Sequence, residues 1–265
     1  MSDSPTLVEY RGNCHCGAFK FTFKAPEIKE TYACNCSICY KNAYLWGFPK
    51  DFLAVKGDID TTLKSYEFAN RTMQHKFCPT CGTSVLARIP DGSIGLNLRT
   101  LDSFDATAVP VAATDDAGAS KEPLYKVPEP VKVEAVPEGT IVYQGSCHCG
   151  AVRYAYLASE APKEATECNC SICHRHGIAW IYPDTPTVVF EGLDSLVEYK
   201  FAEKWRLQGF CGVCGVHVRE RFAKEGKDHR YGLNIRTMNG GVNVADLTIN
   251  KLDGKALLPA YDAGW

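Results

Sequence analysis

The chain has 265 residues, a formal net charge of −2 and a hydrophobic fraction of 45%, a balance typical of a soluble globular protein with one large or two ordinary domains. The near-neutral charge argues against a surface for nucleic acid or anionic membranes, and no apolar run approaches the ~20 residues that cross a bilayer. Residues 1–5 show neither a basic nor an apolar signal-peptide segment, so we expect a reducing, cytoplasmic location. Fourteen cysteines in such a compartment favour metal sites, with a disulfide framework as the alternative.

The cysteines fall into two sets of seven, and the second set repeats the first after 133 or 134 residues. The first set is Cys14, Cys16, Cys34, Cys36, Cys39, Cys78 and Cys81, and the second is Cys147, Cys149, Cys168, Cys170, Cys173, Cys211 and Cys214. Other residues follow the same shift, so the chain is a tandem duplication of one domain and not a solenoid. We expect a first domain over residues 8–105, a second over 139–265, and an extended Pro- and Ala-rich linker over 106–138.

The predicted elements of each copy are mostly short strands. In chain order, strand patterns occur in the first copy at residues 18–23, 45–48, 84–89 and 94–99. The second copy shows them at residues 152–156 and 179–182. A short helical turn is expected after Cys39 and after Cys173, and no segment holds a long 3.6-residue apolar period. The predicted fold is therefore mainly β, with small antiparallel sheets pinned by metal.

A Cys-x-x-Cys-Gly motif late in each copy predicts half of a metal site. In the first copy, Cys78 and Cys81 reach one ion from a tight turn whose positive φ is supplied by Gly82. Cys14 and Cys16 are the natural other half, because strand residues that are two positions apart share a face. The corresponding set in the second copy is Cys147, Cys149, Cys211 and Cys214. Four thiolates close the coordination of a zinc ion, so we expect these sites to be structural.

The remaining cysteines form a second predicted site in each copy, for which no histidine supplies a fourth ligand in both copies. These triplets are Cys34, Cys36 and Cys39, and Cys168, Cys170 and Cys173. A zinc ion with three protein ligands and an open position is typical of a catalytic site, where water or substrate is the fourth ligand. Three thiolates favour a soft substrate thiol in that position. Two alternatives stay open: a carboxylate from a distant loop completes the site, or the thiols have a redox role without metal.

Taken together, these motifs resemble the family of glutathione-dependent formaldehyde-activating enzymes, which includes centromere protein V. Each copy carries Gly-x-Cys-x-Cys-Gly, Cys-x-Cys-Ser-x-Cys, Phe-Cys-x-x-Cys-Gly and Leu-Asn-x-Arg in this order. The resemblance implies a β-tent fold with about four zinc ions per chain, one structural ion on the first and last cysteine pairs and one catalytic ion on the triplet of each domain. It also implies carbon–sulfur lyase chemistry that joins glutathione, as co-substrate, to formaldehyde, or that acts on a related thiol adduct.

Further residues are candidates for proton transfer or substrate contact. The histidine that the family places before Phe-Cys is His75 in the first copy, a candidate proton-transfer group, but Gln208 in the second. Asn and Arg alternate along a predicted strand in each copy, so Arg on the shared face either binds a glutathione carboxylate or forms a structural ion pair. These pairs are Asn97 with Arg99 and Asn234 with Arg236. Lys41 and Arg175, which follow the triplets, are further candidate carboxylate contacts.

We therefore predict a zinc-dependent carbon–sulfur lyase that acts on an adduct of glutathione or another thiol. A non-catalytic zinc scaffold and a thiol-based sensor are the alternatives, although a chromatin scaffold calls for a basic tail that this sequence does not show. The expected partner is a small-molecule thiol or thiol adduct, with no nucleic acid and no membrane. The two copies are expected to mimic a homodimer within one chain, and the first keeps more of the expected active-site residues.

Overall fold

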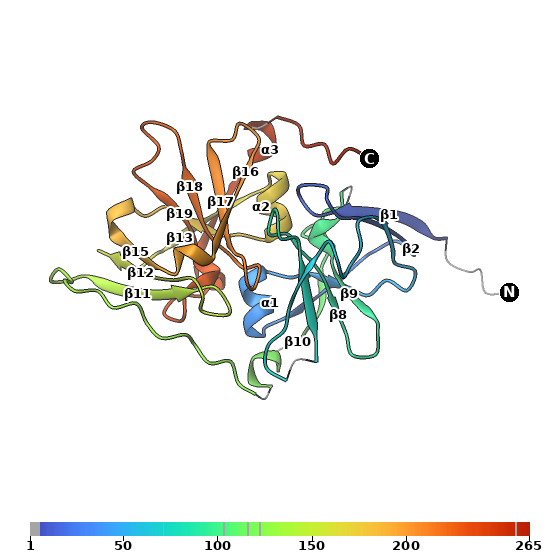
Figure 1. Ribbon diagram of the computed structural model, residues 1–265, viewed down its shortest axis with the longest axis horizontal. Helices are drawn as coiled ribbons and strands as arrows, with labels where there is room; N and C mark the ends of the chain where they lie inside the picture. The colour runs from blue at the N-terminus through green and yellow to red at the C-terminus, as the bar shows by residue number, and fades with distance from the viewer. Residues whose placement is uncertain (1–5, 71, 103, 116, 122, 258) are drawn as a thin grey trace. The chain divides into compact units, whose positions relative to one another are not determined.

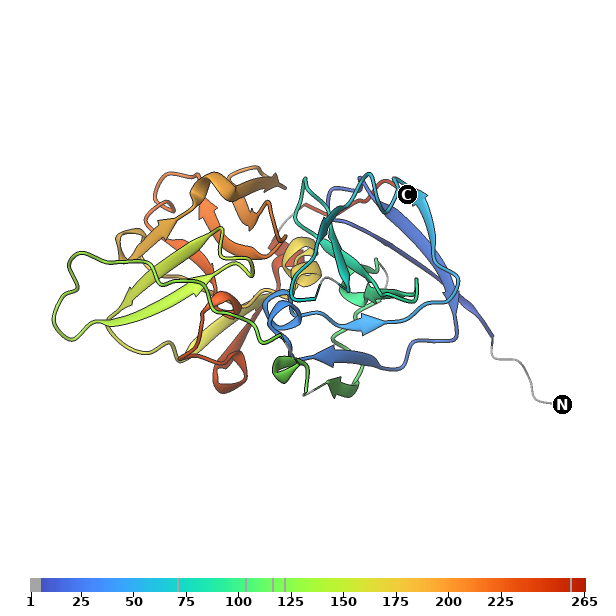
Figure 2. The same cartoon turned by 60° about the horizontal axis from the view of Figure 1, so that its bottom comes forward.

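The computed structural model describes residues 6–70, 72–102, 104–115, 117–121, 123–257 and 259–265. The chain divides into two compact units, of which one comprises Met1–Tyr40, Tyr44–Tyr125 and Asp262–Trp265, and the other Lys41–Ala43 and Lys126–Tyr261. Among the described residues, each unit contains one three-stranded and one seven-stranded sheet (Figures 1 and 2). The predicted mainly β fold of two similar halves is confirmed.

The small sheet of the first unit has the order β1–β2–β5, and its large sheet has the order β10–β3–β4–β9–β8–β7–β6. The strands of the small sheet are β1 (Val8–Asn13), β2 (Lys20–Ala25) and β5 (Leu53–Lys56). Those of the large sheet are β3 (Thr31–Cys34), β4 (Trp46–Gly47), β6 (Lys64–Tyr66), β7 (Gln74–Phe77), β8 (Ser84–Arg88), β9 (Ile94–Asn97) and β10 (Val111–Asp115). Helix α1 (Ser37–Asn42) follows β3, and the 3-10 helices η1 (Leu98–Thr100) and η2 (Gly118–Ser120) follow β9 and β10.

The second unit repeats this topology strand for strand, with the orders β11–β12–β15 and β20–β13–β14–β19–β18–β17–β16. Its strands are β11 (Ile141–Ser146), β12 (Arg153–Ala158), β13 (Glu164–Cys168), β14 (Trp180–Ile181), β15 (Val188–Glu191), β16 (Leu196–Phe201), β17 (Arg206–Cys211), β18 (His217–Phe222), β19 (Tyr231–Asn234) and β20 (Thr248–Leu252). Its helices are α2 (Ser171–His176), α3 (Gly254–Leu257), η3 (Thr185–Thr187), η4 (Leu193–Ser195), η5 (Ile235–Thr237) and η6 (Val244–Asp246). Across the described residues, none of the helices has the length and apolar character needed to cross a membrane.

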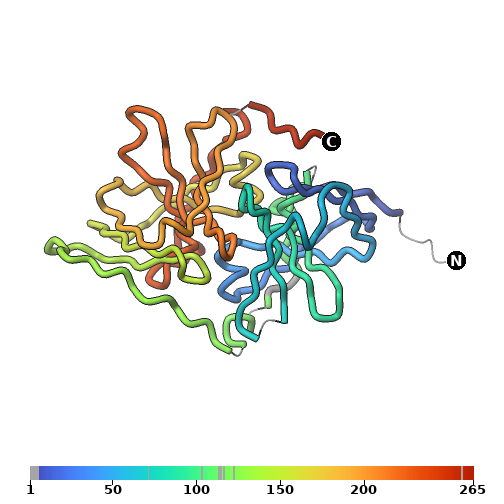
Figure 3. Tube along the Cα trace, in the orientation of Figure 1, coloured from blue at the N-terminus to red at the C-terminus, as the bar shows by residue number. Residues whose placement is uncertain are grey.

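One strand pair in each large sheet is parallel, a feature that the sequence pattern did not reveal. Strand β10 lies parallel to β3, and β20 lies parallel to β13. Strand β10 falls inside residues 106–138, the stretch that we expected to be linker. Within that stretch, residues 124–137 form neither helix nor strand, and the trace in Figure 3 shows this segment leading into β11. Backbone pairing with β3, and not a side-chain pattern, makes residues 111–115 a strand.

Strands near the centre of each large sheet contribute fully buried apolar side chains to the core. In the first unit, Val85 and Leu96 on β8 and β9 are fully buried, and Val218 and Leu233 are their counterparts in the second. Each buried aliphatic side chain stabilises the fold by about 1.5–3 kcal/mol. These strands correspond to the predicted segments 84–89 and 94–99, so the apolar pattern located the core correctly.

Candidate metal centres and the cavity at the second triplet

Each unit contains a cluster of four thiols whose geometry fits a tetrahedral metal ion. The clusters are Cys14, Cys16, Cys78 and Cys81, and Cys147, Cys149, Cys211 and Cys214; in each, the four Sγ atoms lie within 4.8 Å of one another. Neighbouring Sγ atoms in these clusters are 3.6 or 3.7 Å apart. A disulfide would need ~2.05 Å, whereas two sulfurs on a tetrahedral zinc with ~2.3 Å bonds lie about 3.8 Å apart. The spacing therefore suits metal ligation and excludes disulfides in these clusters.

Two turns build each four-thiol cluster. Cys14 and Cys16 lie in a turn after β1, not on the strand as predicted, so the turn and not the pleat directs both thiols to one point. The amide of Phe19 donates to Cys14 Sγ at 3.3 Å, and that of Val152 donates to the equivalent Cys147 Sγ at the same distance. In the Cys-x-x-Cys-Gly turns, Gly82 and Gly215 adopt φ values of 72° and 77°, as the motif predicts.

The three-thiol clusters form where a strand passes into a short helix. Cys34 and Cys168 end β3 and β13, and the other two thiols of each triplet lie at the start of α1 or α2, so the helix begins earlier than we predicted. The three Sγ atoms of each triplet lie within 4.8 Å of one another, and no histidine or carboxylate among the described residues joins either group. Hydrogen bonds from the neighbouring thiols lower the pKa of Cys34 to about 2 and that of Cys168 to about 3. Hydrogen bonds within each triplet raise the pKa of the other two thiols, so the first thiol of each triplet is the one that favours the thiolate form.

A turn beyond the parallel strand lies against each triplet, and sequence reasoning missed it. A methyl group at Gly118 would come within 2.6 Å of Cys34 Sγ, and one at Gly254 would overlap Cys168 Sγ. The middle residue of the Cys-Asn-Cys motif fixes this turn: Asn35 Oδ1 accepts from the amide of Ala119 at 2.8 Å, and Asn169 Oδ1 accepts from that of Lys255 at 3.0 Å. The recurrence of this Asn in both copies was the available signal.

The two triplets differ in the residue that the parallel strand brings beside the first thiol. In the first unit, Asp115 is the register partner of Cys34, and its Oδ2 lies 4.0 Å from Cys34 Sγ and accepts from Lys121 Nζ at 2.5 Å. In the second unit, the register partner of Cys168 is the apolar Leu252. No carboxylate therefore occupies the same place in both copies.

The predicted Asn–Arg pairs do not share a strand face, because β9 and β19 end at Asn97 and Asn234. Each Asn caps the 3-10 helix that contains the Arg: its Oδ1 accepts from the amide of Arg99 at 3.4 Å or of Arg236 at 3.3 Å. The guanidinium of Arg236 donates from Nε to the carbonyl oxygen of Gly177 at 3.0 Å and lies 3.4 Å from a Glu167 oxygen. This geometry matches the structural ion pair for Arg236, and contact with a glutathione carboxylate stays a prediction.

The remaining candidates are buried. His75 is 4% exposed and packs against the rings of Tyr44 and Phe68; burial lowers its pKa to about 4, and its Nδ1 has no hydrogen-bond partner in the described part of the chain. Lys41, which clusters with the second unit, donates from Nζ to the carbonyl oxygens of Ser146 and Thr237 at 3.2 Å and to Asn239 Oδ1 at 3.0 Å, and burial lowers its pKa to about 8. Arg175 donates to the carbonyl oxygen of Ser171 at 3.1 Å and lies over the ring of Tyr261. Substrate contacts by Lys41 and Arg175 stay predictions.

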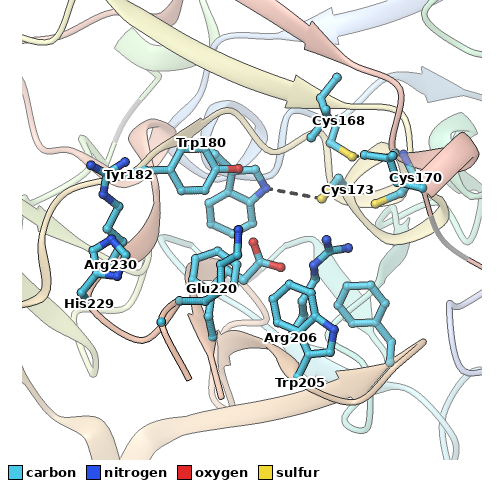
Figure 4. Close-up of a pocket in the computed structure, with 17 residues that line it drawn as sticks. Cys168, Cys170, Cys173, Trp180, Tyr182, Trp205, Arg206, Glu220, His229 and Arg230 are labelled. Atoms are coloured by element: carbon cyan, nitrogen blue, oxygen red, sulfur yellow. Dashed lines mark hydrogen bonds between the residues drawn. The ribbon is translucent and has the colours of Figure 1, made fainter. Parts of the chain in front are cut away.

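A cavity of about 480 Å³ opens at the second triplet, and all three thiols line it (Figure 4). Its wall is aromatic, with Trp180, Tyr182 and Trp205, and it also contains the charged side chains of Arg206 and Glu220. Two donors inside the protein support the thiol of Cys173: Trp180 Nε1 and Gln208 Nε2 each lie 3.4 Å from its Sγ. The glutamine that replaces His75 is therefore a hydrogen-bond donor to the triplet.

Three of the side chains in this cavity have no chemical counterpart in the first copy. After the shift of 133 or 134 residues, Arg206, Glu220 and Tyr182 correspond to Met73, Ala87 and Phe48. The second triplet thus faces two charges and a hydroxyl where the first copy has apolar side chains. Sequence reasoning missed these residues, although a residue-by-residue comparison of the two copies contains the signal.

The fold and the clusters define a protein of two tandem cysteine-rich β domains, each with a four-thiol and a three-thiol centre suited to metal. The sequence profile described as glutathione-dependent formaldehyde-activating enzyme matches residues 9–114 and again residues 142–247, so the chain belongs to this family and carries its domain twice, as predicted.

Two individual proteins are similar over part of the chain. A curated Halomonas elongata protein, provisionally named a glutathione-dependent formaldehyde-activating enzyme, is 32% identical over 82 residues. This match covers 28% of the chain and 52% of the relative, so it spans about half the length of that protein. A crystal structure of a Rhodobacter sphaeroides protein, 26% identical, covers 40% of this chain and 99% of its own, with a TM-score of 0.36.

Proposed function

We propose that the chain is a zinc-dependent carbon–sulfur lyase that forms or cleaves the adduct of a thiol, such as glutathione, with an aldehyde, such as formaldehyde. The observation that carries the proposal is the triplet of thiols, which has no fourth protein ligand among the described residues and which, in the second unit, lines a cavity. Zinc on such a triplet supplies an open position that holds a substrate sulfur as thiolate.

The chain's own residues have separate tasks in this reaction. Trp180 and Gln208 donate to Cys173 Sγ and hold that thiolate in place. The aromatic wall of the cavity excludes water from the reacting carbon and sulfur, which strengthens electrostatic interactions there. Arg206 places a positive charge in the same space, where it attracts an anionic substrate such as a thiol that carries carboxylates.

Zinc content and turnover test the proposal together. The purified chain should hold about four zinc ions, and Cys39→Ser and Cys173→Ser should each remove about one. Exchange NMR of labelled formaldehyde with glutathione measures adduct formation and cleavage against the uncatalysed rate, and a panel of other aldehydes and thiols extends the search. The double triplet variant is the matched control. A chain that holds four zinc ions but accelerates no reaction in the panel would be a scaffold and not a lyase.

A further inference from the structure

Glu220 lies in the cavity of the second triplet without belonging to the metal-ligand group. It is 6% exposed, lies on β18 next to the central strand β19, and lines the same cavity as the three thiols. In Figure 4 its carboxylate points into the space that Cys173 and Arg206 also face. The group of thiols that fits a metal includes no carboxylate, so Glu220 is placed beside the metal position and not as a ligand.

Glu220 faces, across one strand pair, the position that the candidate proton-transfer histidine holds in the first copy. In the first unit, His75 on β7 is the register partner of Ala87 on β8. In the second unit, Gln208 on β17 is the register partner of Glu220 on β18. This cross-strand pair therefore contains one titratable side chain in each copy. The first copy has it on the earlier strand, as His75 on β7, and the second has it on the later strand, as Glu220 on β18. Register partners have Cβ atoms about 4.5–5.5 Å apart, so the two side chains reach the same region of the site.

The surroundings of Glu220 raise the pKa of its carboxyl group toward neutral pH. The partner of Glu220 on β19 is Gly232. The titratable and charged groups that line the cavity with it are Arg206 on β17, Tyr182 after β14, the three thiols of the triplet, and Lys227, His229 and Arg230 between β18 and β19. Burial raises the pKa of Glu220 to about 7, against the opposing effect of Arg206. A buried acid with a raised pKa in a cavity is typical of a functional site.

We propose that Glu220 is the proton-transfer group of the second copy and replaces the histidine that the first copy has on the facing strand. The inference rests on the proposed lyase function. In cleavage, the Glu220 carboxylate takes the proton of the adduct hydroxyl, the oxygen forms the carbonyl bond, and the carbon–sulfur bond breaks with its electron pair on sulfur. In formation, the thiolate attacks the carbonyl carbon and the Glu220 carboxylic acid gives its proton to the oxygen. After cleavage Glu220 releases its proton to solvent, and after formation it takes a proton from solvent.

Glu220→Gln tests this role in a Cys39→Ser chain, where only the second triplet is complete. A group of this kind typically contributes 10²–10⁴-fold, so kcat should fall by about that factor and the rate should lose its dependence on pH near 7. Zinc content should not change, and Glu220→Asp should restore part of the rate. The matched control is Glu198→Gln on β16, whose carboxylate pairs with Arg219 and Arg221 and does not line the cavity.

Each other outcome contradicts a different statement. If Glu220→Gln turns over like the Glu198→Gln control in an active Cys39→Ser chain, Glu220 does not transfer the proton, and the lyase proposal stands. Loss of one zinc ion from Glu220→Gln would show that the carboxylate is a ligand, which also overturns the inference. Absence of turnover in the unmutated chain removes the lyase proposal and this inference with it.

Discussion

Replacing Glu220 by Gln removes a buried acid and should make the second unit less sensitive to alkaline pH. Burial raises the pKa of Glu220 from its ordinary 4.5 to about 7, so between these values the folded chain holds a proton that the unfolded chain has released. The free energy of unfolding therefore falls as pH rises through this window, and the whole loss is present above the folded pKa. The difference between the two pKa values corresponds to about 3 kcal/mol.

The measurement is best made at the pH values of this window at which the cysteine thiolates stay deprotonated and hold metal. With a folded pKa of about 7, about 1.4 kcal/mol of the loss falls between roughly pH 6 and pH 8.5. Hydrogen exchange of peptides from β17 and β18 measures the local free energy of opening in this region. The unmutated chain should lose about 1.4 kcal/mol relative to Glu220→Gln across that range. Glu198→Gln is the control, because Arg221 keeps the pKa of Glu198 below its ordinary value. A pH-independent difference between Glu220→Gln and the unmutated chain would refute the reasoning.

Three further changes test the metal centres and the turns around them. Cys81→Ser breaks a four-thiol cluster and should unfold much of the first unit, whereas Cys39→Ser should remove only about one zinc ion; equal melting temperatures would contradict this division. Gly254→Ala places a methyl group against the second triplet, so mass spectrometry should find about one zinc ion fewer per chain. The exposed Lys255→Ala is its control, and unchanged zinc would mean that the turn adjusts. Ala43→Gly relieves a φ of 47° at the end of α1, where the second copy has glycine, and should raise the free energy of unfolding by about 0.5–1 kcal/mol in urea titrations; a decrease would count against strain there.

The clusters were predictable from sequence because metal ligation leaves a spacing signature. Cys78 and Cys81 reach one point through a four-residue turn, and this geometry is local. The pairing of Cys14 with Cys78 is not local, and it followed only from counting which cysteines lacked partners. The structure brings these cysteines together, although the turn that orients Cys16 differs from the strand that we predicted.

Glu220 could not be placed from its own stretch of sequence. In residues 218–222 three consecutive charged side chains stand between Val218 and Phe222, a pattern that predicts exposure to solvent. The cavity that contains it is lined by residues from distant segments, among them Trp180 and Leu252. The parallel strand β10 escaped prediction for a similar reason, because its partner β3 is distant in the sequence. Val111 on β10 pairs with Thr31 on β3, which lies 80 residues earlier in the chain.

Arg206 and Glu220 both line the second cavity and replace Met73 and Ala87 of the first copy. A zinc ion on three thiolates carries a net charge of about −1, so a carboxylate beside it meets repulsion as well as desolvation. Arg206 offsets this repulsion and lowers the pKa of Glu220, and both residues are apolar in the first copy, where the neutral His75 needs no counter-charge. In the direction of adduct formation, the rate falls as Glu220 loses its proton. Arg206→Met should therefore shift this fall in rate to higher pH, while the same change in a Glu220→Gln chain should leave the rate independent of pH in this range. A shift of equal size in both chains would show that Arg206 acts on substrate alone.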